Sequence, residues 1–332
     1  MRRPGIDYEA YMRIAQQLDA TTTPPTDTEI TQAGRYMPEL LELYANGYRR
    51  GLSTGWRSID EYYTVRHGEF TVITGIPGHG KSAWLDNVMI NLARREKWHW
   101  CVFSAENFPV SRHIAGLVEI YTQRPFLKGP NPRMSPTDLD LAVQFLNDHF
   151  HFIQPREDSY SLNRIVQLAA SIADLDALVI DPWNELDHSR QADTREDQYI
   201  SIALSKLRWL ARAADIHIFV VAHPAKYQRV HGQPKPVITL NECKGASEWY
   251  AKADNGISIW RDEMDTTGAS DVHIQKIRFR EVGRAGGAVR LYYDRVTGCY
   301  SDPNQRATVE EYVERQQEFE LRRTREPGDD DE

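Results

Sequence analysis

Short apolar runs recur through the middle of the chain and alternate with longer amphipathic stretches. Strongly apolar runs of this kind are typical of strands buried on both faces of a parallel sheet. Four runs carry this signal, "FTVIT" (70–74), "WCVFS" (100–104), "ALVID" (177–181) and "IHIFVV" (216–221). Helical spacing characterises the intervening "KSAWLDNVMINLARR" (81–95) and "DQYISIALSKLRWLARAAD" (197–215). The alternation predicts an α/β domain whose mainly parallel sheet is covered by helices on both faces.

Three later runs are rich in strand-forming residues and are separated by turn-like gaps. They are "GISIW" (256–260), "VHIQKIRF" (272–279) and "AVRLYY" (288–293). Because short gaps between strands favour hairpins, we expect these runs to extend the same sheet. The domain predicted from this pattern covers residues 51–303.

Residues 1–50 have the pattern of a helical extension. A first helix is predicted over 7–19, and the Thr- and Pro-rich stretch 21–28 follows it as a linker. A second helix is expected from Pro38 to a stop at Gly51, with one apolar face made by Leu40, Leu41, Tyr44 and Tyr48. An apolar stripe outside the core needs a partner, which is either a domain of its own or a neighbouring subunit.

The third predicted part is residues 304–332. Thr308 and Glu311 form a capping-box pattern ahead of a highly charged helix, and the last four residues are acidic. Such a segment is either a solvated helix with a frayed tail or an acidic tail that docks on a partner.

Composition narrows the class of protein. The 332 residues carry a formal net charge of -8, which argues against a generally basic nucleic-acid coat but allows a local basic channel. The three cysteines lie far apart in the sequence, so neither a zinc pattern nor a disulfide framework is expected, and a reducing cytoplasm is the expected location. No apolar stretch approaches the length of a membrane span, and no secretory signal is recognisable at the N-terminus.

A glycine-rich turn directly follows the strand predicted at 70–74. Its sequence fits Gly75-x-x-x-x-Gly80-Lys81-Ser82, in which backbone N–H groups and a helix N-terminus converge on phosphate oxygens. Lys81 would reach the β- and γ-phosphates, and Ser82 would ligate Mg²⁺. The turn lies between a strand and an amphipathic helix, as this role requires. The expected nucleotide-binding residues of this segment are Gly75, Pro77, Gly78, His79, Gly80, Lys81, Ser82 and Ala83.

Polar residues end three of the other predicted strands. Asp181 has the position of an acid that holds the Mg²⁺ shell, and Glu106 follows the strand at 100–104. From spacing, Glu106 is either the residue that polarises the attacking water or a solvated acid. His223 follows the strand at 216–221 and is, taken alone, equally consistent with a packed histidine.

A polar, basic stretch comes after His223. Lys226, Arg229 and Lys235 would lie at the ligand-binding edge, where they could contact nucleic-acid phosphates, although a solvated loop explains the composition equally well.

A set of segments resembles, in order, the helicase domain of the Twinkle-like branch of DnaB-type hexameric replicative helicases, which includes phage primase–helicases. The resembling segments are "GLSTGWRSIDEYY", "GEFTVITGIPGHGKSAWLD", "FSAEN", "VIDPWNELDH", "FVVAHPAK", "ADNGISIWRD", "KIRF" and "LYYDRVTGCYSD". The resemblance covers about residues 50–302 and implies a RecA-like P-loop NTPase core preceded by a linker helix. The primase half of these proteins has no counterpart in the sequence.

The resemblance implies a role for each matching residue. It makes Glu106 the catalytic glutamate, Asp181 the metal-binding acid and His223 the sensor of the γ-phosphate. Lys276 and Arg278 match a Lys-x-Arg pair supplied by the neighbouring subunit, with Arg280 as a competing candidate. Residues implied to flank the nucleobase are Arg261 and Tyr293, and the helix after Pro38 matches one that packs on the next subunit.

The function implied is an ATP-dependent replicative DNA helicase that forms a ring and moves along single-stranded DNA. The implied cofactors are ATP or another NTP with Mg²⁺, and the implied partners are single-stranded DNA, further copies in a hexamer or heptamer, and a primase or polymerase. The compactness of the chain suggests that it comes from a phage or mobile element and that it acts in the host cytoplasm. Two alternatives stay open: a RecA-type recombinase or repair ATPase that forms a filament, and a nucleotide-switched scaffold in a replication complex.

Overall fold

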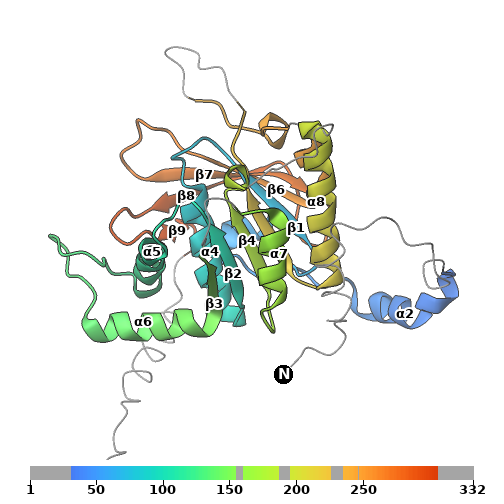
Figure 1. Cartoon of the computed structure of the whole chain (residues 1–332), viewed down its shortest axis with the longest axis horizontal. Helices are drawn as coiled ribbons and strands as arrows, with labels where there is room; N and C mark the ends of the chain where they lie inside the picture. Colours follow the sequence, from blue (N-terminus) through green and yellow to red (C-terminus); the bar gives the residue numbers. More distant parts are fainter. Residues whose placement is uncertain (1–30, 155–159, 187–194, 226–234, 246, 306–332) are drawn as a thin grey trace, which may run out of the picture.

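The strands of the domain form a single sheet. The computed structural model describes residues 31–154, 160–186, 195–225, 235–245 and 247–305, and within them the sheet has nine strands in the order β3-β2-β4-β5-β1-β6-β7-β8-β9 (Figure 1). The strands from β3 to β6 in this order run parallel, and β7, β8 and β9 each run antiparallel to their neighbours. Their bounds are β1 Phe70–Thr74, β2 Trp100–Ser104, β3 Phe150–Ile153, β4 Ala177–Asp181, β5 His217–Val221, β6 Asn255–Trp260, β7 Ala269–Ile277, β8 Gly287–Tyr293 and β9 Tyr300–Ser301.

Two hydrophobic cores lie on opposite faces of this sheet. One contains side chains of α4, α5 and α6, and the other contains side chains of α7, α8 and α9. The α-helical bounds are α2 Met37–Asn46, α3 Arg57–Asp60, α4 Lys81–Glu96, α5 Val110–Thr122, α6 Pro136–His149, α7 Leu162–Ala170, α8 Glu196–Ala213 and α9 Ser247–Lys252. Short 3₁₀ turns are η1 Ala33–Tyr36, η2 Trp183–Glu185 and η3 Leu240–Glu242. The layered α/β arrangement confirms the fold class predicted from the sequence.

The predicted strands are all present, and the sheet contains two more. All residues of β1, β4 and β5 are buried, as expected for strands covered on both faces. The run at 256–260 is not the start of an antiparallel extension, because β6 pairs parallel with β1 and the direction reverses only at β7. The strands β3 and β9 were not predicted.

The N-terminal helix differs from its prediction at the C-terminal end. Helix α2 has Pro38 in its first turn, as expected, but it ends at Asn46 and is capped by Gly47, whose φ is 68°. The prediction of a stop at Gly51 was wrong, and Tyr48 lies beyond the helix. Leu40, Leu41 and Tyr44 are exposed, so the apolar stripe has no covering within the described part of the single chain.

Several predictions fall on parts of the chain outside the described residues. These are the helix at 7–19, the linker at 21–28, the helix with Thr308 and Glu311, and the acidic tail. Among the described residues, none of the helices is both long and apolar enough to cross a bilayer.

Candidate nucleotide site and its surroundings

The phosphate loop joins the carboxyl end of β1 to the start of α4. Gly75 has a φ of 139°, and a Cβ at this position would overlap the carbonyl oxygen of Ile259 on β6. Gly80 has a φ of 90°, and a Cβ there would overlap the hydroxyl of Tyr300. Both positions therefore require glycine, one for a close approach of two backbones and one for an aromatic side chain.

Lys81 lies inside the loop rather than on the surface. Its ammonium donates hydrogen bonds to the carbonyls of Gly75 and Ile76, at 3.0 and 3.1 Å, and the residue is 5% exposed. Burial lowers the pKa of Lys81, while the carboxylates of Asp181 and Glu106 act in the opposite direction. The cation is thus held where a phosphate group would replace its carbonyl partners.

Asp181 ends β4 beside the start of α4. Burial raises the pKa of Asp181 to about 6, a hydrogen bond with Ser82 opposes the rise, and the Asp86 and Glu106 carboxylates add to it. A bound divalent cation would stabilise the ionised form of this buried acid. Ser82 and Asp181 offer the oxygen ligands that Mg²⁺ prefers, so they fit this ion. Within the described residues, no group of three or more His, Cys, Asp or Glu side chains could hold a metal. Phosphate oxygens and water would complete the shell, as is usual for Mg²⁺.

Glu106 and His223 face each other across the same edge. The Nε2 atom of His223 lies 3.7 Å from Oε1 of Glu106, whose side chain is 52% exposed and therefore open to water. Burial, and secondarily the Lys81 cation, lowers the pKa of His223. The backbone N–H of His223 donates to Oδ1 of Asn184 at 2.9 Å. Glu106, His223, Lys81 and Asp181, far apart in sequence, thus gather at the carboxyl edge of the parallel strands.

Sequence reasoning missed three residues that support this group. Asn184 fixes the backbone at His223, and Asp86 on α4 pairs with His113 on α5 at 2.9 Å. Burial opposes protonation of His113, but the Asp86 carboxylate outweighs it, so the pKa of His113 is raised. The spacing of Ser82 and Asp86 on one helix face was the available signal for this pair.

The residues expected at the nucleobase lie beside the loop. Arg261 directly follows β6, and its backbone N–H donates to Nδ1 of His79 at 3.1 Å. Tyr293 ends β8 and packs against Tyr300, with ring centroids 5.0 Å apart. Burial raises the pKa of both tyrosines, that of Tyr300 to about 12. At the tip of the loop, Gly78 is exposed.

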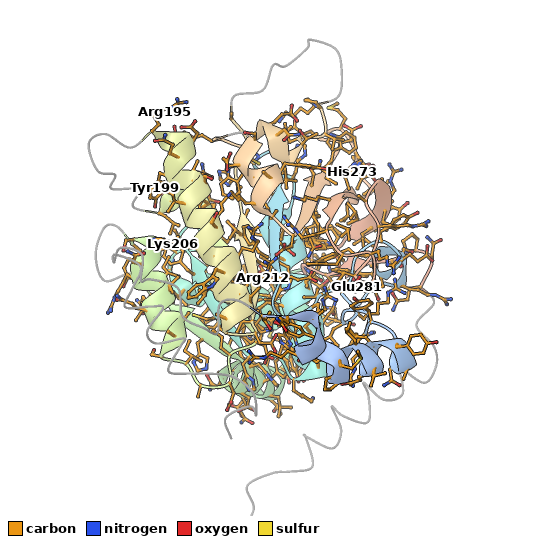
Figure 2. All side chains as sticks on the ribbon, turned by 90° about the vertical axis from the view of Figure 1, so that its right-hand side faces the viewer. Arg195, Tyr199, Lys206, Arg212, His273 and Glu281 are labelled. Atoms are coloured by element: carbon orange, nitrogen blue, oxygen red, sulfur yellow. The ribbon has the colours of Figure 1, made fainter. Side chains whose placement is uncertain are left out.

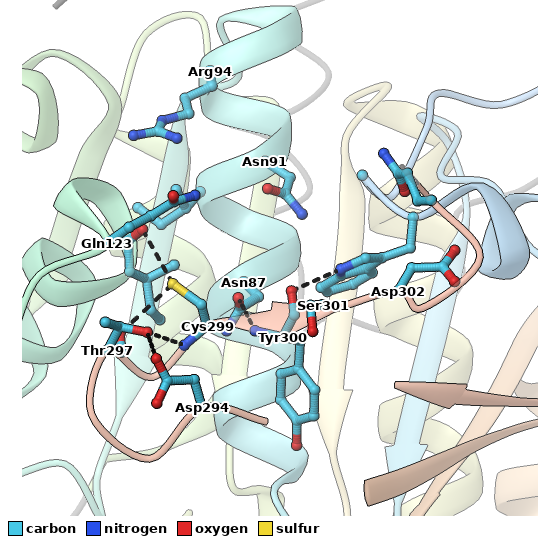
Figure 3. A pocket seen from close by; sticks show the side chains of 15 residues that line it. Asn87, Asn91, Arg94, Gln123, Asp294, Thr297, Cys299, Tyr300, Ser301 and Asp302 are labelled. Atoms are coloured by element: carbon cyan, nitrogen blue, oxygen red, sulfur yellow. Dashed lines mark hydrogen bonds between the residues drawn. The ribbon is translucent and has the colours of Figure 1, made fainter. Parts of the chain in front are cut away.

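The segment 294–302, which follows β8 and includes β9, holds α4 in position. Asn87 accepts from the Tyr300 N–H at 3.0 Å (Figure 3). It also donates to the carbonyl of Gly298 at 2.9 Å, and Trp56 Nε1 donates to the Tyr300 carbonyl at 3.1 Å. A cavity of about 470 Å³ borders this segment, α4 and the end of α5. Gly298 and Tyr300 of the motif "YDRVTGCYSD" therefore brace the helix that opens with Lys81.

Lys276 and Arg278 lie at the opposite edge of the sheet from the phosphate loop. The Nε atom of Arg278 lies 2.8 Å from Oδ1 of Asp254, whose other oxygen accepts from the N–H of Phe70 at the start of β1. Asp254 is fully buried and also pairs with Arg212 of α8, a helix seen from its exposed side in Figure 2. Phe70 marks this edge. The five residues of β1, at about 3.3 Å each, place it about 16 Å from Gly75.

The Lys276 ammonium contacts the carbonyl of Tyr250 and lies 4.9 Å from the centre of its ring. Burial, aided by the neighbouring Arg278, lowers the pKa of Lys276 to about 8. Arg280 is exposed. In the described part of the chain, Lys276 and Arg278 contact Asp254 and carbonyls of 250–253 rather than the phosphate loop.

Of the three basic residues expected to contact DNA, the structure describes one. Lys226 and Arg229 lie outside the described residues. Lys235 is at the carboxyl edge: its ammonium pairs with Glu263, and its carbonyl accepts from Nε1 of Trp260 at 2.7 Å.

A phosphate loop, a strand-end acid and a glutamate on a layered α/β core define a P-loop NTPase with a RecA-like fold. Residues 51–300 match the DnaB-like helicase C terminal domain family, and the chain belongs to that family. The chain is 35% identical over 268 residues to the Twinkle homolog protein, chloroplastic/mitochondrial, of Arabidopsis thaliana. That alignment spans 77% of this chain but only 37% of the relative, so the chain corresponds to just over a third of that protein's length.

Solved structures carry the same fold. One of them, described as an ATPase domain, aligns with a TM-score of 0.66 at 17% identity, over 82% of this chain and 99% of the other. A DnaB-like replicative helicase, described with its interactions with primase, aligns with a TM-score of 0.64 at 18% identity, over 86% of this chain and 70% of the other. These likenesses confirm the RecA-like core.

Proposed function

We propose that the chain is an ATP-hydrolysing DNA helicase that forms a ring, moves along single-stranded DNA and unwinds duplex DNA. The observation that carries this proposal is that the phosphate loop follows one end of β1, whereas Arg278 pairs with Asp254 at the other end, about 16 Å away along the strand. A site that needs both groups must therefore draw them from two copies of the chain. Membership of the DnaB-like family supports the same arrangement.

In this proposal the residues of the carboxyl edge bind and hydrolyse the nucleotide. Backbone N–H groups of the loop cradle the phosphates, and Lys81 exchanges its carbonyl partners for phosphate oxygens. Glu106, open to water and 3.7 Å from His223, orients the attacking water. His223 then responds to the γ-phosphate, and Arg261 and Tyr293 flank the base.

Mg²⁺ would be held by Ser82 and Asp181. When bound, the ion neutralises charge on the β- and γ-phosphates. Between turnovers, the hydrogen bond with Ser82 keeps the buried Asp181 carboxylate oriented toward the loop.

The neighbouring copy supplies Lys276 and Arg278 to stabilise charge on the transferred phosphoryl group. Cations supplied in this way contribute roughly 10³–10⁵ in rate. The exposed apolar stripe of α2 would bridge to the next copy and be covered there. We propose that the assembly is a hexamer or heptamer. We also propose a primase as a partner, because a DnaB-like replicative helicase of the same fold is described with its interactions with primase.

Lys226, Arg229 and Lys235 are proposed to contact DNA phosphates. A basic segment that starts just after His223 at the nucleotide edge supports this assignment. We propose a cytoplasmic location for the protein; its cysteines, Cys101, Cys243 and Cys299, are unpaired, which fits a reducing compartment.

The test is unwinding of a forked DNA duplex with ATP and Mg²⁺, with Lys81→Ala as the matched control. We expect the wild-type chain to separate the strands and Lys81→Ala to lose both unwinding and ATP hydrolysis while keeping its fold. ATP hydrolysis stimulated by single-stranded DNA without any strand separation would favour the recombinase alternative. Nucleotide binding without turnover would favour the scaffold alternative.

A further inference from the structure

His79 in the phosphate loop has a buried ring nitrogen without a hydrogen-bond partner among the described residues. The residue is 2% exposed, and its Nδ1 accepts from the backbone N–H of Arg261 at 3.1 Å. Because a backbone N–H can only donate, the proton of the neutral ring must be on Nε2. Within the part of the chain that the structure describes, Nε2 is buried with no hydrogen-bond partner. An unmade bond of this kind is costly, so the ring is poised to donate to a group that can move toward it.

Four charged groups among the described residues act on His79: Lys235 at the end of the basic segment, Arg261 and Glu263 after β6, and Lys81 in the loop itself. Burial lowers the pKa of His79 to about 4, and the next contributions come from Lys235 and Glu263. Lys235 pairs with Glu263, whose side chain is 47% exposed. Trp260 donates its Nε1–H to the carbonyl of Lys235, and the next residue, Arg261, donates its backbone N–H to His79. His79, Lys235 and Glu263 thus meet at the end of β6.

The phosphate loop rests on this end of β6. Gly75 approaches the Ile259 carbonyl so closely that a Cβ would not fit, and His79 is bonded to Arg261 two residues further on. A movement of the loop on phosphate binding would therefore displace the His79 ring relative to the end of β6.

We propose that His79 is a positioning residue that relays nucleotide binding to Lys235. Its Nε2–H competes with the Lys235 ammonium for the Glu263 carboxylate. With nucleotide bound, His79 donates to Glu263, and the Lys235 ammonium turns to a phosphate of single-stranded DNA. Without nucleotide, Glu263 holds Lys235. This relay rests on the proposed DNA helicase function and runs separately from Glu106 and His223.

The relay has a measurable salt signature. A single-stranded DNA phosphate contact contributes about 0.7 to the slope of log affinity against log salt concentration. The slope should therefore steepen by about 0.7 when a non-hydrolysable ATP analogue and Mg²⁺ are added. The affinity itself should rise about fivefold or more, at the lower end of known couplings between two sites.

The test measures the binding of fluorescent oligothymidylate to the full chain, with and without saturating ATP analogue, at several salt concentrations. Glu263→Gln removes the shared charge, so the affinity without nucleotide should rise to the nucleotide-bound value, and the slope difference should vanish. His79→Asn keeps an acceptor for Arg261 but lacks the distal donor, so the nucleotide-bound affinity should fall to the nucleotide-free value. His79→Gln places an amide near the Nε2 position and should recover part of the response.

The substitutions at His79 and Glu263 thus shift opposite states, which loss of structure would not do. Thermal unfolding of each variant identifies any that fails to fold, and Glu263→Gln, at an exposed side chain, carries the test in that case. A wild-type response that Glu263→Gln leaves unchanged would overturn the relay while leaving the helicase proposal intact. A wild-type chain that does not bind single-stranded DNA in either state would overturn both.

Discussion

Replacing Arg278 with alanine separates a structural role from a role in a neighbouring site. In the single chain, Arg278 pairs with the fully buried Asp254 at 2.8 Å and also donates to the carbonyls of Ala251 and Ala253. The substitution leaves Asp254 with Arg212 at 3.3 Å and the Phe70 N–H. Since Arg278 is about a third exposed, we expect a loss of about 2 kcal/mol, below the roughly 3–5 kcal/mol typical of a fully buried pair.

That loss is too small to explain a large fall in turnover. A domain starting near about 5 kcal/mol would keep about 3 kcal/mol and remain more than about 99% folded at 25 °C. The melting temperature should fall by about 4–8 °C. A cation supplied to a neighbour contributes roughly 10³–10⁵ in rate, so ATP turnover should fall by that factor while nucleotide binding persists.

The assay is ATP hydrolysis by each variant alone and by mixtures. Arg278→Ala has an intact phosphate loop and Lys81→Ala an intact Arg278, so mixed assemblies should regain part of the activity. Arg212→Ala is the matched control, because its side chain touches the same Asp254 from α8 and is 47% exposed. It should cost less than about 1 kcal/mol and keep near-normal turnover. Arg280→Ala tests the competing arginine. Equal activity loss in the Arg278 and Arg212 variants, or no rescue although subunits exchange, would refute the shared site.

Three further outcomes follow from the structure. Glu106→Gln should retain ATP binding and lose about 10²–10⁴ in turnover, and loss of binding measured by equilibrium titration would instead make Glu106 structural. Replacing both Leu40 and Leu41 with serine (Leu40→Ser, Leu41→Ser) should shift assembly, measured by light scattering, to higher protein concentration. Unchanged assembly would show that α2 does not bridge neighbouring copies. Burial lowers the pKa of His217 to about 3, so the unfolded chain binds this proton first as the pH falls below about 6.5. Stability measured by urea unfolding should then drop by about 1.4 kcal/mol per pH unit, with a shallower slope in His217→Gln.

The strands buried on both faces were predicted from the sequence, whereas the edge strand β3 and the two-residue strand β9 were not. β1, β4 and β5 are buried at every position, and most of their residues are apolar, which makes these strands easy to recognise. β3 lies at the edge of the sheet, and its two middle residues are more open than its ends, with His151 exposed. β9 has only two residues and depends on pairing with β8. Edge and two-residue strands carry too little local signal, because tertiary contacts decide them.

Helix α2 shows how a local signal can mislead. Gly47 and Gly51 lie on either side of Tyr48, the last residue of the predicted apolar face, and either glycine could cap the helix. The helix stops at the first, where the backbone already has a positive φ of 68°. Of the predicted face, Leu40, Leu41 and Tyr44 lie in the helix, and Tyr48 does not.

Strand-end polar residues were predictable because parallel strands bring their carboxyl ends to one edge. That rule gives Lys81, Glu106, Asp181 and His223 a common location, but it does not give the 3.7 Å approach of Glu106 to His223. Partners such as Asn184 and Asp254 depend on register between distant strands. Sequence spacing carries no information on such pairs, and the pairing of Arg278 with Asp254 of its own chain was therefore not foreseen.

The two edges of the sheet also limit the assemblies that can complete the site. In the proposed shared site, the phosphate loop at one end of β1 meets Arg278 from the other end of β1 in the next copy, so the contact would be head-to-tail. Head-to-tail contacts close into a ring when the rotation per subunit divides a full turn, and otherwise grow into a filament. We infer that closure is the property that separates the helicase from the recombinase alternative. Electron microscopy with an ATP analogue and single-stranded DNA should therefore find closed hexamers or heptamers, whereas filaments at every protein concentration would assign the chain to the recombinase class.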